Sequence, residues 1–236
     1  MSERRNAFSS YRVTEFLVQF ERITRREAVT NSIGPILKTG GLILTGGHST
    51  RMGRSKAHLP FGEELMLQRV ASLLAQAVDP IVVVGAPGQE LPPLPPQVAV
   101  AHDEVADRGP LAGLAAGLRA LTGRCDSAFA TSCDVPLLRP QFVECIVGLL
   151  AGHRIAVPLV DEFHHPLSAV YRLDVLDDVD AMLAADRLRP RFLFDAVDTR
   201  IVTRDELLGA DPELNSLRNC NRPEDYEKAL SDAGLA

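Results

Sequence analysis

The chain has 236 residues, of which 46% are hydrophobic and 24% are charged, and this composition is typical of a folded globular protein rather than a disordered chain. The formal net charge of -6 argues against a protein that binds nucleic acid through phosphate contacts. No apolar run of about 18 residues and no secretory leader is found, so we expect a cytoplasmic protein that does not enter a membrane.

The first 38 residues differ from the rest of the chain. Apolar side chains recur there at helical spacing between Val13 and Ile23, and no strand is predicted. A docking or targeting helix is one interpretation, and a helical or disordered extension that packs loosely on the remainder is the favoured one. We therefore divide the chain into an N-terminal extension, residues 1–38, and one domain, residues 39–236.

From Gly40 onward, short apolar runs alternate with segments of helical periodicity. Strands are predicted at residues 41–46, 80–85, 97–102 and 127–133, and helices at residues 63–78, 111–121 and 140–151. The strand segments are apolar at nearly every position, which is typical of strands covered by helices on both faces. This order predicts an α/β fold with a mainly parallel sheet.

The last third of the chain is less regular. Two strands joined by a short connection are predicted at residues 155–160 and 165–173, and a helix follows at residues 174–185. A final helix is predicted at residues 223–233, because Pro223 suits the first helical turn and acidic residues follow it, where the helix dipole favours negative charge.

The densest group of polar residues is "LTGGHSTRMGRSK", residues 44–56, directly behind the first predicted strand. Gly46 and Gly47 permit backbone geometries in which successive N–H groups face a phosphate, and Arg51 and Lys56 add positive charge. The spacing matches neither a Walker loop nor a dinucleotide fingerprint. A glycine turn beside a solvated basic loop is the alternative, but the cluster of positive charge after a buried strand favours a phosphate-binding loop.

A single carboxylate, Asp134, follows the strand predicted at residues 127–133. Because parallel strands bind ligands at their carboxyl ends, Asp134 is expected at the same edge of the sheet as the glycine-rich stretch. Mg²⁺ typically takes one or two carboxylates and completes its shell with phosphate oxygens and water. The alternative, an aspartate that caps the next turn, is equally compatible with the pattern alone.

Asp103 follows the strand predicted at residues 97–102 and therefore belongs to the same edge. Its carboxylate is suited to hydrogen-bond a ribose or a base. Asp107 offers the same chemistry, although its position is more typical of a loop or a helix start. The sequence "GPLAG", residues 109–113, then opens a helix whose small residues permit close packing.

Five motifs in this order, between Gly40 and Leu230, resemble the MobA-type molybdenum cofactor guanylyltransferase family: "LTGGHSTRMGRSK", "GPLAG", "CDVPLL", "HPLSAVY" and "NCNRPEDY". The resemblance implies a three-layer, Rossmann-like nucleotidyltransferase fold. It also implies an enzyme that transfers GMP from GTP to the terminal phosphate of Mo-molybdopterin, which yields molybdopterin guanine dinucleotide and pyrophosphate. The implied cofactor is Mg²⁺, and the implied protein partners are other molybdenum cofactor biosynthesis proteins or acceptor molybdoenzymes.

The resemblance also assigns roles to residues of this sequence. It places the nucleotide against Leu44, Thr45, Gly46, Lys56, Asp103 and Asp134. Asp134 would also bind Mg²⁺, and Arg51 and Lys56 would stabilise charge on the leaving pyrophosphate, so these three residues are the expected catalytic group. Asn219 and Asn221 match an N-x-N motif that is associated with the pterin substrate.

Two positions depart from the family pattern. Thr45 stands where Ala is common, and Gly85 stands where many members have Asn, so one nucleotide contact of the family is missing at Gly85. The forms "LTGG" and "CDVP" favour GTP over CTP. The alternatives are a CTP-dependent molybdopterin cytidylyltransferase, a nucleotidyltransferase for a sugar or alcohol phosphate, and a non-catalytic nucleotide-binding domain.

Overall fold

A computed structural model of the protein describes residues 37–45, 55–103 and 108–236. Gly46, Gly47 and Arg51 of the predicted phosphate-binding loop lie outside these ranges, and so does Asp107. The helix considered within the N-terminal extension also lies outside the described residues.

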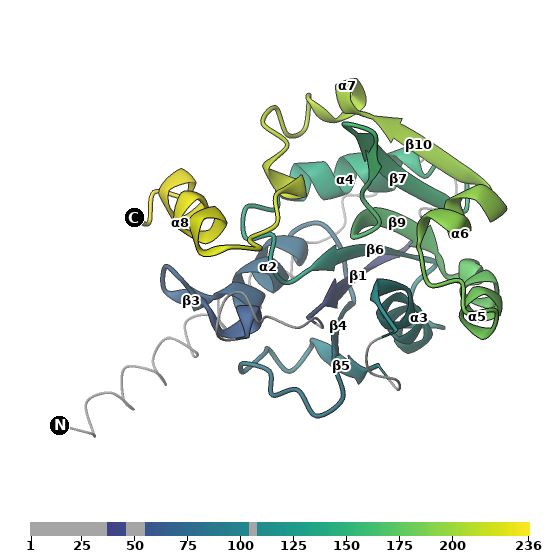
Figure 1. The fold of residues 1–236 in the computed structure, drawn as a ribbon, viewed down its shortest axis with the longest axis horizontal. Coiled ribbons are helices and arrows are strands. Elements are labelled where there is room, and N and C mark those ends of the chain that lie inside the picture. Colours follow the sequence, from purple (N-terminus) through teal and green to yellow (C-terminus); the bar gives the residue numbers. More distant parts are fainter. Residues whose placement is uncertain (1–36, 46–54, 104–107) are drawn as a thin grey trace.

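One sheet forms the centre of the described part of the chain (Figure 1). Its strands are β1 (Thr39–Leu44), β4 (Ile81–Gly85), β5 (Ala99–His102), β6 (Ser127–Ser132), β7 (Ile155–Val160), β8 (Phe163–His164), β9 (Ser168–Arg172) and β10 (Thr199–Thr203). Their order is β10-β7-β9-β6-β1-β4-β5, and β8 pairs with β7. The pairs β1–β4, β1–β6, β4–β5 and β7–β10 are parallel, whereas β9 and β8 run antiparallel to their neighbours. The predicted mainly parallel sheet is confirmed.

Helices cover both faces of the sheet. The longer ones are α2 (Met66–Leu74), α3 (Pro110–Leu121), α4 (Pro140–Leu149), α5 (Leu176–Ala184) and α8 (Pro223–Asp232). Short turns of helix are η1 (Lys56–His58), η2 (Leu173–Val175), α6 (Arg191–Ala196), α7 (Arg204–Leu207) and η3 (Asn215–Leu217). No helix in the described ranges combines the length and the apolar character needed to cross a membrane.

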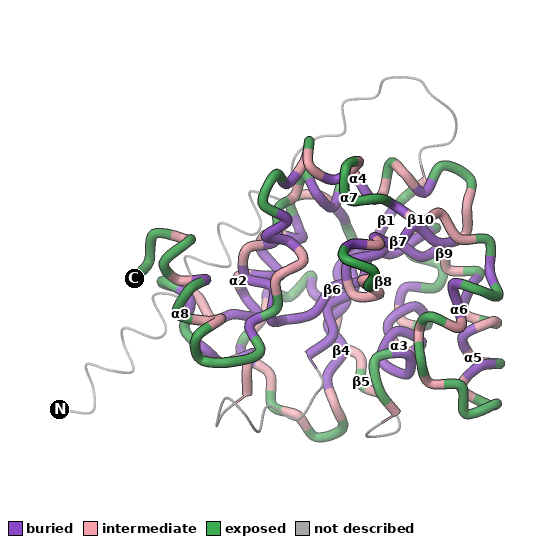
Figure 2. The backbone as a smooth tube through the Cα atoms, turned by 45° about the horizontal axis from the view of Figure 1, so that its top comes forward, coloured by how far each residue is buried: buried purple, intermediate pink, exposed green. Residues whose placement is uncertain are grey.

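Two apolar cores lie on opposite faces of the sheet, and β1 contributes to both. Ile43 packs with α2 and α4, whereas Leu42 and Leu44 pack with α3, because successive side chains of a strand point to opposite faces. Figure 2 shows that the central strands are buried, while the outer surfaces of the helices carry the exposed residues. This arrangement confirms the three-layer α/β fold.

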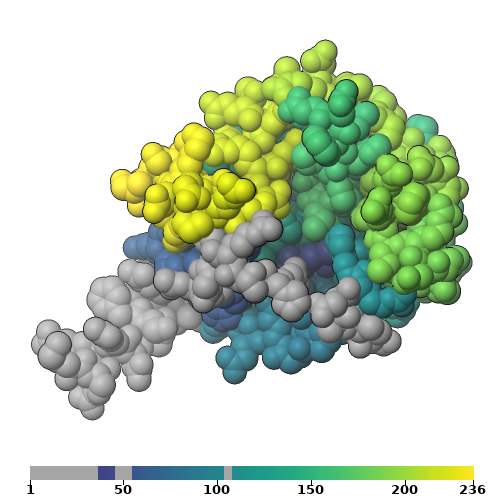
Figure 3. All heavy atoms as spheres, viewed as in Figure 1, coloured from purple at the N-terminus to yellow at the C-terminus, as the bar shows by residue number. Residues whose placement is uncertain are grey.

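The parallel register aligns the carboxyl ends of the central strands. Leu44, the last residue of β1, lies opposite Ser132 of β6 and Val84 of β4. The segments that leave these three strands therefore start side by side at one edge of the sheet. In Figure 3 the residues of β1 are seen at the floor of a hollow between the C-terminal segment and the region of α3.

The C-terminal helix is attached to the segment that follows the glycine-rich stretch. A third apolar cluster joins Cys220 and Ala229 to Leu59, Phe61 and Met66. The Tyr226 hydroxyl also donates a hydrogen bond to the Pro60 carbonyl. These contacts bring residues near positions 56 and 220 together, although they are far apart in the sequence.

Several elements differ from the sequence-based expectations. The helix expected from residue 63 begins at Met66, because a two-stranded hairpin, β2 (Pro60–Phe61) and β3 (Glu64–Leu65), precedes it. The strand expected from residue 165 begins at Ser168. β10 and α6 were not predicted, because β10 is an edge strand paired on one side only and α6 has six residues, too few for a periodic pattern.

The packing of α3 on β1 requires Gly117. A Cβ at this position would lie 2.0 Å from Leu42 Cδ1, so we expect Gly117→Ala to lower the free energy of unfolding. Overpacking costs about 1–3 kcal/mol and the better helix propensity of Ala returns about 1 kcal/mol, which predicts a net loss of up to about 2 kcal/mol in urea denaturation. Gly148 of α4 is the matched control, because no atom lies within 4 Å of its Cβ position. Equal stability of the two alanine variants would contradict the close approach.

Candidate active site

Asp134 lies two residues beyond the end of β6, and its carboxylate is almost fully buried, with the residue 7% exposed. The Ser132 hydroxyl donates a hydrogen bond to Oδ1, and the Asn219 amide nitrogen donates to the same oxygen at 2.8 Å. The backbone carbonyl of Asp134 also accepts a hydrogen bond from the N–H of Cys220 at 2.8 Å. These bonds fix the orientation of the carboxylate and leave Oδ2 facing Lys56.

Lys56 is the first residue of η1 and pairs with Asp134. Its Nζ lies 2.7 Å from Asp134 Oδ2 and 2.8 Å from the side-chain oxygen of Asn221. Burial of a charged group is costly unless it is paired and hydrogen-bonded, and both partners here meet that condition. Residues from the start of η1, from the end of β6 and from the segment before α8 thus form one polar group. We call it the Asp134 network, and its members are Lys56, Ser132, Asp134, Asn219 and Asn221.

The segment that carries both asparagines is held in an extended form before α8. The Asp225 carboxylate accepts hydrogen bonds from the N–H groups of Asn221, at 3.0 Å, and of Arg222, at 2.9 Å, and so closes the start of the helix. Asn219 and Asn221 reach the Asp134 network, while Cys220 between them turns into the apolar cluster. Neighbouring side chains of this segment therefore serve the polar site and the apolar cluster.

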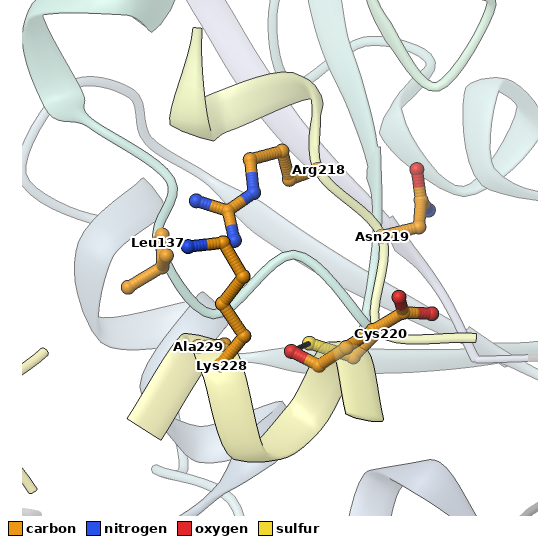
Figure 4. A pocket seen from close by; sticks show the side chains of 7 residues that line it. Leu137, Arg218, Asn219, Cys220, Lys228 and Ala229 are labelled. Atoms are coloured by element: carbon orange, nitrogen blue, oxygen red, sulfur yellow. Dashed lines mark hydrogen bonds between the residues drawn. The ribbon is translucent and has the colours of Figure 1, made fainter. Parts of the chain in front are cut away.

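A pocket of about 250 Å³ lies behind this segment. It is lined by Leu137, Arg218, Asn219, Cys220, Asp225, Lys228 and Ala229. Figure 4 shows that the Asn219 side chain points away from the other labelled side chains. Arg218 and Lys228 both contact Asp232, so their charges are engaged at the rim.

The thiols beside the Asp134 network are not reactive groups. Burial and the nearby Asp134 carboxylate raise the pKa of Cys133 to about 12, and burial together with the same carboxylate raises the pKa of Cys220 to about 12. Both thiols are therefore protonated at neutral pH, and only a thiolate is a good nucleophile. The site offers no cysteine chemistry from these two positions.

Thr45 occupies the exit of β1, next to β4. Its N–H donates to the carbonyl of Val84 at 2.9 Å, and its hydroxyl lies 3.0 Å from the same carbonyl and 3.1 Å from Gln89 Oε1. The preceding residue, Leu44, is buried, and its carbonyl accepts the N–H of Cys133 at 3.0 Å. These polar groups of the strand end are therefore hydrogen-bonded within the protein.

Asp103 lies at the same edge, one strand beyond β4. It follows β5 directly, and its N–H donates to the carbonyl of Gly85 at 3.0 Å. Gly85 has space for a side chain, because the nearest atom that an added Cβ would meet is His102 Nδ1, at 3.5 Å. The departure from the family pattern at Gly85 is therefore not imposed by crowding.

The structure brings Lys56, Asp134, Asn219 and Asn221 into direct contact and places Leu44, Thr45 and Asp103 along the same sheet edge. Sequence reasoning missed Ser132 and Gln89. Ser132 is the last residue of an apolar strand, and that position was the available signal. Gln89 lies four residues beyond β4 in a loop, where no pattern marks it.

The donor set also limits the kind of metal site. Among the residues that the structure describes, no group of three His, Cys, Asp or Glu side chains could enclose a metal ion. Asp134 is a single buried carboxylate whose Oδ2 contacts the Lys56 ammonium group. A cation that takes its remaining ligands from phosphate and water would have to share or take over this oxygen.

Comparisons with known proteins show what the chain is similar to. The model of the MobA-like NTP transferase domain matches residues 41–199. A relative from Mycobacterium avium (strain 104), described as a probable molybdenum cofactor guanylyltransferase, is 35% identical over 201 residues, which cover 84% of this chain and 97% of its own. One of the same description from Mycobacterium ulcerans (strain Agy99) is 38% identical over 171 residues, or 70% of this chain and 84% of its own.

Two solved structures share the fold. Molybdopterin-guanine dinucleotide biosynthesis protein A from Archaeoglobus fulgidus matches with a TM-score of 0.68 at 20% identity, over 84% of this chain and 100% of its own. The 2-C-methyl-D-erythritol 4-phosphate cytidylyltransferase from Thermus thermophilus matches with a TM-score of 0.63 at 17% identity, also over 84% and 100%. At these identities the likeness shows the fold alone.

The opposite hydrogen-bond roles of Asn219 and Asn221 predict opposite effects of isosteric substitutions. Asn219→Asp replaces a donor by a second carboxylate against Asp134, which raises the pKa of the pair in the folded state. A raised folded pKa gives stability that is lost as the pH rises, so the deficit against wild type should grow above about pH 4 and reach roughly 1–3 kcal/mol at pH 8.

Asn221→Asp serves as the matched control, because it keeps an acceptor for Lys56 and adds an attractive charge. We expect its free energy of unfolding to stay within about 0.5 kcal/mol of wild type or to rise slightly at low salt. Urea denaturation of both variants between pH 5 and pH 8 is the measurement. The same pH profile for both would show that the two amides are not oriented as described.

Proposed function

The chain belongs to the MobA-like NTP transferase domain family and is a nucleotidyltransferase, and we propose that it transfers GMP from GTP to the terminal phosphate of Mo-molybdopterin. The observation that carries the proposal is the buried Asp134–Lys56 pair at the edge where the central strands end. Support for the guanine nucleotide comes from relatives that are described as molybdenum cofactor guanylyltransferases and match most of this chain.

In the proposed reaction a phosphate oxygen of the acceptor attacks the α-phosphorus of GTP. A new P–O bond forms, the bond between the α-phosphorus and the bridging oxygen breaks, and pyrophosphate leaves with the electron pair. The attacking phosphate is already an anion, so no strong general base is required. The protein contributes alignment of the two substrates and stabilisation of the charge that develops.

Lys56 supplies preorganised positive charge in this scheme. Two acceptors, Asp134 Oδ2 and the Asn221 oxygen, hold its ammonium group before any substrate binds, so little reorganisation is needed during the reaction. We propose that Lys56 contacts the nucleotide phosphates. Arg51, which lies outside the described residues, is proposed to stabilise the leaving pyrophosphate with it.

We propose Mg²⁺ as the cofactor and Asp134 as its protein ligand. When bound, Mg²⁺ would neutralise phosphate charge near the reacting phosphorus. The chain's own contribution is to orient the carboxylate: Ser132 and Asn219 both donate to Oδ1, which leaves Oδ2 as the exchangeable oxygen. Ser132 is thereby a positioning residue for the proposed ligand.

The substrate contacts and cellular context are also proposals. Leu44, Thr45, Gly46 and Asp103 would line the nucleotide. Asn219 and Asn221 would face the pterin substrate in addition to holding Asp134 and Lys56, and their exposed position leaves them accessible to a ligand. A cytoplasmic location and binding to cofactor biosynthesis proteins or acceptor molybdoenzymes stay predictions.

Asp134→Asn should abolish transfer while the fold is retained. The substitution removes the charge that pairs with Lys56 and holds the proposed metal, so we expect pyrophosphate release from GTP and Mo-molybdopterin to fall at least about a hundredfold. Asp126→Asn is the control, because Asp126 precedes the same strand at its opposite end and accepts the Lys38 N–H at 2.8 Å. An Asp134→Asn enzyme with near wild-type turnover would exclude Asp134 from the catalytic group.

The choice of nucleotide and acceptor separates the proposed activity from its alternatives. With Mo-molybdopterin as acceptor, we expect pyrophosphate release from GTP to exceed that from CTP by at least about tenfold, because one well-placed polar contact to a base is worth about that factor. A preference for CTP would indicate the cytidylyltransferase. Turnover only with a sugar or alcohol phosphate would indicate a nucleotidyltransferase for that class of acceptor. Nucleotide binding without turnover on any acceptor would indicate a non-catalytic domain.

A further inference from the structure

Gln89 follows β4 in the loop that leads to β5, and its half-buried side chain turns back onto the edge where the nucleotide is proposed to bind. The amide contacts two strand ends. Oε1 accepts the N–H of Ala86 at 2.9 Å, and Nε2 donates to the carbonyl of Thr45 at 3.3 Å. The side chain therefore ties the exit of β1 to the exit of β4.

The orientation of this amide is determined by its partners. A backbone N–H, that of Ala86, requires an oxygen opposite it, and a backbone carbonyl, that of Thr45, requires a nitrogen. A flipped amide would leave both partners unsatisfied. Gln89 is thus a donor toward Thr45 and an acceptor toward Ala86 at the same time.

The contact acts on the peptide unit that leaves β1. The Thr45 carbonyl is the backbone acceptor at the exit of β1, so a bond to this oxygen restricts the orientation of the peptide group to which it belongs. The Thr45 hydroxyl is restricted as well. It has one proton and two acceptors within reach, the Val84 carbonyl at 3.0 Å and Gln89 Oε1 at 3.1 Å.

Gly85 leaves space at this edge for a side chain from the loop. The last residue of β4 carries no side chain, and a Cβ built on it would lie 3.7 Å from Gln89 Oε1. Gln89 therefore presents its amide beside the position that a side chain on β4 would otherwise occupy. Its polar group reaches this edge from four residues further along the chain.

We propose that Gln89 is a positioning residue for the nucleotide, which holds Thr45 at the exit of β1 in the conformation that accepts GTP. This inference rests on the proposed function, because it presumes that a nucleotide binds at this edge. It predicts a specific loss of nucleotide affinity when the amide is removed, whereas a purely structural clip would cost stability without affecting affinity.

The sequence offers a matched control in Gln68. Its Oε1 accepts the N–H of Leu65, three residues earlier, and its Nε2 donates to the distant Pro93 carbonyl, as the corresponding atoms of Gln89 do toward Ala86 and Thr45. Gln68→Ala therefore removes the same two kinds of hydrogen bond without touching the exit of β1.

The test is equilibrium binding of GTP with Mg²⁺ by titration calorimetry, together with urea denaturation and steady-state kinetics. We expect Gln89→Ala to raise the Kd for GTP about fivefold to twentyfold and to raise KM similarly, with kcat within about threefold of wild type, because ground state and transition state lose the contact equally. Gln89→Glu should lose at least as much, since a carboxylate cannot donate to the Thr45 carbonyl. Gln68→Ala should leave the Kd within about twofold, whatever its stability.

Two results would overturn the inference: an unchanged Kd in Gln89→Ala, or an equal loss of affinity in Gln68→Ala. The binding readout keeps this test separate from that of the proposed function. A wild-type protein that binds GTP but does not transfer GMP would overturn the proposed function. The role of Gln89 in binding would then still be decided by the Kd values of the Gln89 variants. A wild-type protein that binds no nucleotide would overturn both.

Discussion

The arrangement of the whole site depends on one buried carboxylate. Asp134 is charged in surroundings that expose 7% of the residue, and such a charge is tolerated only when its oxygens are paired and hydrogen-bonded. The donors come from three segments that are distant in sequence: Ser132 at the end of β6, Lys56 after the glycine-rich stretch, and Asn219 before α8. The packing of α8 on the β2 region is what keeps these segments together.

The central position of β1 links this edge to the stability of the domain. Leu42 and Ile43 anchor the strand in two different cores, and α3 approaches it closely because Gly117 leaves no side chain in the way. A strand held on both faces cannot shift along its neighbours without exposing a core. The aligned ends of β1, β4 and β6, and therefore the position of the polar groups beyond them, follow from apolar packing far from the site.

The sequence predicts those parts of the fold that depend on local pattern. Buried strands and amphipathic helices have repeating apolar positions, and the place of Asp134 follows from its position after such a strand. The partners of Asp134 cannot be predicted from local pattern, because the contacts of Ser132 and Asn219 depend on how distant segments pack and on which rotamers the side chains adopt. Edge strand β10, with one neighbour, and the two-residue β8 lack a pattern long enough to be detected.

Positive and negative charge balance at the described site, so the proposed nucleotidyl transfer would need further cations. The positive charge of Lys56 is compensated by Asp134, and the surrounding groups from Asn219, Asn221 and Ser132 are neutral. A triphosphate that enters this edge therefore meets well-oriented hydrogen-bond donors but little net positive charge from the network. In the proposed reaction, the triphosphate would be neutralised by a divalent cation at Asp134 Oδ2, the oxygen that Lys56 holds here, and by the arginines in the stretch before Lys56.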